Sequence, residues 1–126
     1  MKGLVITTEN KMQVREFGEP AYESIGKAVG GWIEVVHPKG LPDPFCMVVN
    51  EEGLLQNLPW NLFGSFLCGT IYHGNPIVGD IVLLKEGYTD AGERDLIGLD
   101  EEDIKFLGAM AISESGGDIK WESEGQ

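Results

Sequence analysis

The side chains best suited to metal binding or catalysis are two histidines and two cysteines: His37, Cys46, Cys68 and His73. They show neither the Cys-x-x-Cys nor the His-x-x-x-His spacing of structural zinc sites. The pattern therefore predicts no metal and no cofactor. The best set for acid–base catalysis is His73 with Asp80 and Glu34, but no nucleophile-elbow motif accompanies it. We expect a protein that is not an enzyme.

Adjacent carboxylates and glycines could also form binding sites, but each has a structural explanation. Glu51-Glu52 falls in a predicted turn, and Glu101-Glu102-Asp103 falls at a predicted helix start, although both could hold a hard cation. The 18 glycines contain neither a phosphate loop nor a dinucleotide fingerprint. They are typical of turns.

Two short segments combine aromatic and polar side chains in a way that suits ligand binding. Gly30-Gly31 precedes Trp32 and Glu34, so backbone donors and an indole face could hold a planar ligand. Trp60, Asn61 and Phe63 lie at a predicted helix N-terminus, which favours anions. Core packing is the alternative for both segments. The candidate binding residues are therefore Trp32, Glu34, Trp60, Asn61, Phe63 and Asp80.

The hydrophobic pattern predicts the elements that position these residues. Strands are expected at 3–7, 12–17, 32–36, 45–49, 70–72 and 81–85, with 54–55 returning along the sheet after a tight turn at 50–53. Helices are expected from Pro20 to Val29, from Leu62 to Leu67 behind an Asn61 cap, and from Glu101 to Ala109 behind an Asp100 cap.

These elements predict an α+β domain over residues 1–112, with a mostly antiparallel sheet and two or three packed helices. From Ser113 onward the chain is mainly Gly, Ser and acidic residues, a composition that does not favour a packed core. Residues 113–126 are therefore expected to form a flexible acidic tail.

The charge balance limits the possible partners. The chain has 21 Asp and Glu against nine Lys and Arg, a formal net charge of −12. This charge repels phosphate backbones and anionic membranes, so neither direct nucleic-acid binding nor membrane binding is expected. It attracts basic protein surfaces, and solubility alone is the competing explanation. The apolar run within the first eight residues is too short for the core of a signal peptide. Both cysteines lie in or beside apolar runs, which suits reduced thiols, so a cytoplasmic protein is expected.

Four segments in order resemble a known family: VGGWIEVV at 29–36, VVNEEG at 48–53, LPWN at 58–61 and PIVGDIVLLKEG at 76–87. The combination is similar to the domain-of-unknown-function family DUF3846, over roughly residues 1–107. The resemblance implies an accessory protein of phages or mobile elements, encoded near antirestriction genes. It implies no catalytic residue.

These observations leave several functions open. The first is an acidic inhibitor of a host defence protein with a basic surface, acting in the host cytoplasm. The second is a protein that sequesters a small nucleotide signal, which requires a local basic pocket from Lys27, Lys85, Arg94 or Lys105. A small hydrolase, an assembly scaffold and a homo-oligomer are further alternatives.

Overall fold

A computed structural model describes residues 1–70 and 74–122 of the chain. Its strands are β1 (Lys2–Ile6), β2 (Lys11–Glu16), β3 (Ile33–Val36), β4 (Phe45–Asn50), β5 (Ile81–Tyr88), β6 (Arg94–Ile97) and β7 (Lys120–Trp121). The helices of the described part are α1 (Ala21–Val29), α2 (Leu62–Cys68) and α4 (Glu101–Glu114).

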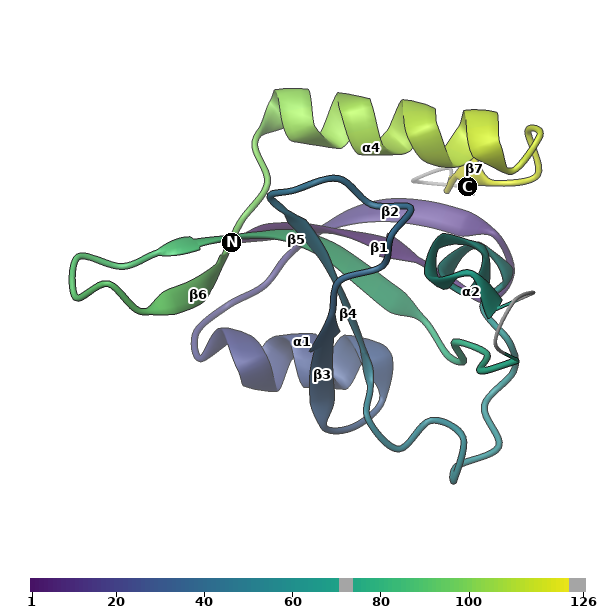
Figure 1. Cartoon of the computed structure of the whole chain (residues 1–126), viewed down its shortest axis with the longest axis horizontal. Coiled ribbons are helices and arrows are strands. Elements are labelled where there is room, and N and C mark those ends of the chain that lie inside the picture. Colours follow the sequence, from purple (N-terminus) through teal and green to yellow (C-terminus); the bar gives the residue numbers. More distant parts are fainter. Residues whose placement is uncertain (71–73, 123–126) are drawn as a thin grey trace.

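The strands form one sheet in the order β3-β4-β5-β1-β2-β7, and β6 pairs with β5 beside this path. The β2–β7 pair is parallel and the other strand pairs are antiparallel. In Figure 1, α1 lies on one face of the sheet, and α2 and α4 lie on the other. The predicted α+β domain with a mostly antiparallel sheet is confirmed.

Helices on both faces explain why the central strands are apolar without alternation. Every residue of β4 is buried. Its Cys46 and Val48 pack toward α1, whereas Phe45, Met47 and Val49 belong to the cluster under α2 and α4. The core therefore consists of two apolar layers separated by the sheet.

The predicted helix ends agree with the structure where a capping residue at the end itself specifies them. Helix α1 follows Pro20 and ends at Gly30, whose φ of 91° is the left-handed conformation that glycine adopts readily. The Asn61 side chain caps α2, and Asp100 caps α4 in a capping box with Asp103. Helix α4 continues to Glu114, beyond the predicted end at Ala109.

Other predictions need correction. Leu54 and Leu55 do not return along the sheet but are exposed in a series of turns, because β3 and β5 already occupy both edges of β4. The predicted strand at 70–72 falls largely outside the described residues. Strand β6 was not predicted.

The segment after Ser113 is ordered further than predicted. Helix α4 includes Ser113 and Glu114, Ile119 is buried in the core, and β7 pairs with β2. The Trp121 ring lies against Gly108 of α4, where a Cβ atom would come within 2.5 Å of it. The body of the fold therefore extends through Glu122.

Candidate functional site

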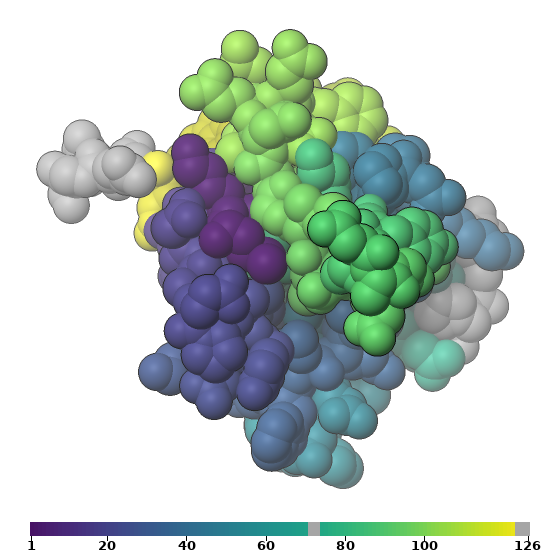
Figure 2. All heavy atoms as spheres, turned by 90° about the vertical axis from the view of Figure 1, so that its left-hand side faces the viewer, coloured from purple at the N-terminus to yellow at the C-terminus, as the bar shows by residue number. Residues whose placement is uncertain are grey.

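The β5–β6 hairpin projects from the body of the fold. It extends beyond the helical layers in Figure 1 and points toward the viewer in Figure 2, beside the first turn of α4. Tyr88 on this hairpin has 74% of its surface exposed, and Ile97 on the opposing strand is also exposed. Tyr88 therefore presents an aromatic side chain on the projecting part of the hairpin, whereas Ile97 pairs with Lys85 at its base.

The base of the hairpin is fixed by Glu86. Its carboxylate contacts His37 Nε2 through one oxygen, and the other oxygen lies 3.3 Å from Arg94 Nε. The Glu86 side chain is only 11% exposed, so water screens these interactions less than it screens a surface pair. Glu86 therefore joins both strands of the hairpin to the loop after β3.

A second set of charges connects the hairpin to α4. Lys85 Nζ lies 2.6 Å from Asp103 Oδ2 and 3.9 Å from Asp100 Oδ2. The hydrogen bond to Asp103 raises the pKa of Lys85. Desolvation is the largest single influence on Asp103 and opposes its ionisation, but the hydrogen bonds from Lys85 and Asp100 and the positive charge of Lys85 together outweigh it and lower the pKa of Asp103. Lys85 and Asp103 are therefore an ion pair at neutral pH.

The remaining carboxylates of this region face solvent. Between Glu86 and Ile104 the chain contains eight carboxylates and a single cation, Arg94, which is paired with Glu86. The exposed ones define what we name the acidic face: Asp90, Glu93, Asp95, Asp100, Glu101 and Glu102. Figure 2 views the molecule from this side. The sequence analysis singled out Asp100, Glu101 and Glu102 of this set at a helix start, but not Asp90, Glu93 and Asp95, because strand β6 was not predicted.

Trp32 and Glu34, two of the predicted binding residues, lie at the start of β3, an edge strand. Trp32 has 72% of its surface exposed, and Glu34 is also exposed. The backbone N–H of Glu51 donates to the Trp32 carbonyl at 2.8 Å, which places the first turn after β4 beside Trp32. Both side chains are available to a partner.

Asn61 and Phe63 are interior residues. The Asn61 amide donates to the carbonyls of Ile6 and Gly79, each at 3.0 Å, and its oxygen accepts from Gly64 N–H at 2.9 Å. Phe63 is buried and stacks on Phe66. Their roles are to fix α2 on the sheet, whereas Trp60 is 54% exposed.

Asp80 lies where the two predicted segments meet. It lines a pocket of about 210 Å³ together with Gly30 of the first segment and Pro59, which directly precedes Trp60 of the second. One Asp80 oxygen accepts from Thr8 N–H at 3.1 Å. The pocket is smaller than the roughly 300–1,000 Å³ of typical small-molecule sites. His73, the proposed catalytic companion of Asp80, falls outside the described residues.

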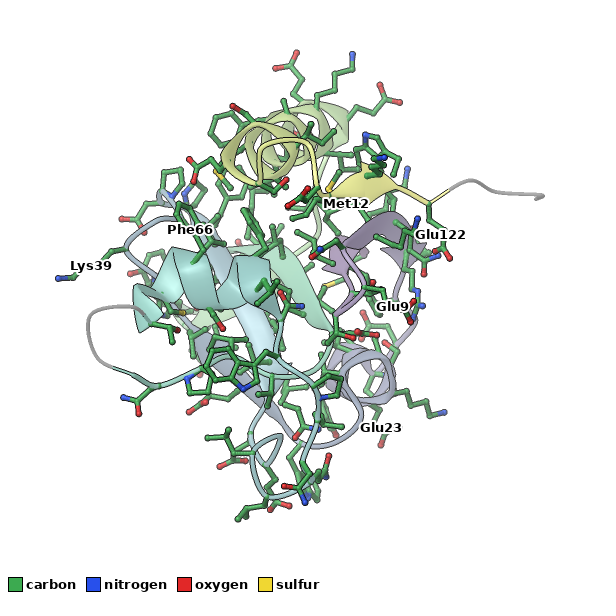
Figure 3. The ribbon with its side chains drawn as sticks, turned by 90° about the vertical axis from the view of Figure 1, so that its right-hand side faces the viewer. Glu9, Met12, Glu23, Lys39, Phe66 and Glu122 are labelled. Atoms are coloured by element: carbon green, nitrogen blue, oxygen red, sulfur yellow. The ribbon has the colours of Figure 1, made fainter. Side chains whose placement is uncertain are left out.

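A larger hollow of about 850 Å³, which we name the α2 pocket, lies between α2, the loop after β3 and the end of α4. Its walls are mainly apolar, and its ionisable lining groups include His37, Lys39, Cys68 and Glu114. Figure 3 shows Phe66 rising from α2 toward α4, with Lys39 projecting outward nearby. The pocket suits an apolar group with a polar end. This pocket was not predicted from the sequence, because its walls come from segments far apart in the chain.

Both cysteine thiols are disfavoured as nucleophiles by burial. Burial raises the pKa of the Cys46 thiol to about 12, and burial also raises the pKa of Cys68, so neither forms a nucleophilic thiolate readily. Among the residues that the structure describes, no group of three His, Cys, Asp or Glu side chains could hold a metal ion. Within the same residues, no helix is long and apolar enough to cross a membrane.

Comparisons with known proteins identify one relationship. No curated protein matches the chain, and no solved structure does. Residues 1–111 match the family described as Domain of unknown function (DUF3846), which covers every described element except the end of α4 and β7. The chain therefore belongs to the DUF3846 family.

Proposed function

We propose that this protein is a non-enzymatic binding protein that uses its acidic face to occupy a basic surface on another protein. In the setting that the family resemblance suggests, the partner is a defence protein of a bacterial host and the protein serves a phage or mobile element. The observation that carries the proposal is the concentration of exposed carboxylates on and beside a projecting hairpin.

Charge and shape both support this function. A concentrated negative field accelerates encounter with a positive surface and orients the two proteins. The hairpin can enter a groove that a flat surface cannot enter, and Tyr88 supplies an exposed aromatic anchor at the same place. A nucleic-acid-binding groove has the complementary charge and form.

A displacement assay tests the proposal. A DNA-cleaving host defence enzyme is bound to labelled DNA, and the protein is added at low and at raised salt. We expect the DNA to be released, and the release to weaken as salt increases, because the opposing surfaces attract through screened charges.

Two variants with equal net charge separate the acidic face from the charge of the whole protein. The first neutralises Asp90, Glu93, Asp95, Glu101 and Glu102 as amides; the second neutralises five exposed carboxylates elsewhere, namely Glu9, Glu23, Glu52, Glu114 and Asp118. Each changes the net charge from −12 to −7, because five carboxylates become neutral. The first variant should lose displacement and the second should keep it. Equal displacement by both variants would contradict the proposal.

A further inference from the structure

Strand β3 has an open edge. It ends the order of the sheet and pairs only with β4. In Figure 1 its arrow lies in front of α1. A strand in this position presents backbone donors and acceptors to which another strand can add.

The register identifies these groups. The Glu51 N–H donates to the Trp32 carbonyl, so the pair Trp32–Glu51 is hydrogen-bonded, and hydrogen-bonded pairs must alternate along the antiparallel ladder. The backbone N–H and C=O groups of Glu34 and Val36 therefore form hydrogen bonds with β4. Ile33 and Val35 direct their N–H and C=O groups away from the sheet, and within residues 1–70 and 74–122 no hydrogen bond occupies these groups.

The other outer strands are less open. In β6 the outward N–H of Leu96 is already bonded to the Asp95 carboxylate at 2.8 Å. Strand β7 has only two residues. Strand β3 is longer than β7, and its outward N–H groups are not bonded to a side chain in the described structure. Its sequence also contains no proline, so the Glu34 charge is the one feature of the strand that opposes addition of another strand.

The side chains around β3 indicate the chemistry of an added strand. Trp32, Glu34, Glu51 and Glu52 are all exposed near its beginning, and the chain contains no Lys or Arg between Gly40 and Leu84. A lysine or arginine there would meet carboxylates and an indole face that favours cations. At the other end, Val36 and His37 line the α2 pocket, whose walls are mainly apolar.

We propose that β3 binds an extended segment of a partner protein by strand addition, with a basic residue at the Trp32 end and an apolar residue at the α2 pocket. A second copy of this chain is a poorer occupant, because antiparallel pairing of two β3 strands would bring two Glu34 side chains together between molecules that each carry a net charge of −12. The site is separate from the acidic face and does not depend on its function.

Short synthetic peptides with blocked ends test this site directly. Two probes alternate Thr and Val between a terminal Lys and a terminal Leu, in opposite orders, to allow both strand directions. Control peptides replace Lys by Glu. In NMR titrations at millimolar peptide, one Lys probe should shift the amides of Ile33 and Val35 and slow their hydrogen exchange, while the Glu controls should not.

Protein variants separate strand addition from loose electrostatic attraction. Val35→Pro removes the outward backbone N–H of residue 35 and leaves the backbone hydrogen bonds of Glu34 and Val36 to β4 in place. It should weaken peptide binding by at least about tenfold. Glu34→Lys, which changes only an exposed side chain, should weaken it about fivefold, whereas Glu23→Lys on α1 should not.

Three results would overturn the inference. The first is an absence of peptide-dependent shifts at β3 for both Lys probes. The second is peptide binding that stays unchanged both in Glu34→Lys and in a Val35→Pro variant that still folds. The third is concentration-dependent protection of Ile33 and Val35 without peptide, which would identify a second copy as the occupant.

Discussion

At the scale of single residues, Asn61 shows how a polar side chain becomes part of a core. It is 1% exposed, and three backbone groups on α2, β1 and the segment before β5 use its amide. A buried amide is stable only when its hydrogen bonds are satisfied. The feature that suggested a binding site is instead the joint that holds α2 on the sheet.

Replacing Asn61 by Ala should therefore lower the free energy of unfolding by about 2–3 kcal/mol, because a helix cap is lost and two carbonyls lose their donor. Chemical denaturation measures this change. Leu62→Ala is the matched control, since Leu62 is adjacent but 61% exposed and should cost less than about 1 kcal/mol. Equal losses in both variants would show that the Asn61 bonds contribute little.

At the scale of elements, the Lys85–Asp103 pair joins β5 to the start of α4 and makes stability depend on pH. The pKa of Asp103 is lowered in the folded state, so its contribution is present above the ordinary aspartate pKa of 3.8 and is lost as pH falls through the folded value. The pKa of Lys85 is raised, so its contribution persists below 10.5 and is lost as pH rises through the folded value.

Asp103→Asn should consequently destabilise the protein by about 0.5–1 kcal/mol at neutral pH, and by progressively less as pH falls below 3.8. Denaturation across an acid pH series measures the difference. Glu102→Gln, in the same helical turn but without an ion pair in the described structure, should show a smaller change. A loss for Asp103→Asn that is constant across the series would contradict this account.

The C-terminal segment is another element that stabilises the fold. Ile119 is 1% exposed within the layer under α4, so Ile119→Ala should cost about 2–4 kcal/mol in unfolding free energy. Thermal or chemical denaturation checks the value. Ser113→Ala, at an exposed position of α4, is the control and should change little. A loss below about 0.5 kcal/mol for Ile119→Ala would restore the view that this segment is peripheral.

The elements that sequence predicted correctly carry local signals. The caps at Asn61 and Asp100 and the stop at Gly30 depend on residues within one helical turn. Strands β6 and β7 have no comparable signal, because their pairing with β5 and β2 is set by the rest of the sheet. Ile119 lies between Asp118 and Lys120 in a segment rich in Gly, Ser and acidic residues, and only its tertiary position shows that it is buried.

At the scale of the whole molecule, the sequence indicated the acidic character but not where it is concentrated. Net charge follows from composition, whereas the acidic face exists because the β5–β6 hairpin folds back beside the cap of α4. For the predicted binding residues, too, the sequence indicated the residue types but not which side chains are exposed. Trp32 and Glu34 remain available on an edge strand, while Asn61 and Phe63 pack inside.

The measurement that tests the central claim most directly is native mass spectrometry of the protein after incubation in lysate from bacteria with active defence systems. The parent protein and the variant neutralised away from the acidic face should both gain the mass of the same partner protein. The acidic-face variant should not gain it, and raised salt should release it. Retention of that partner by the acidic-face variant, or a gain of only several hundred daltons from a small molecule, would contradict the account.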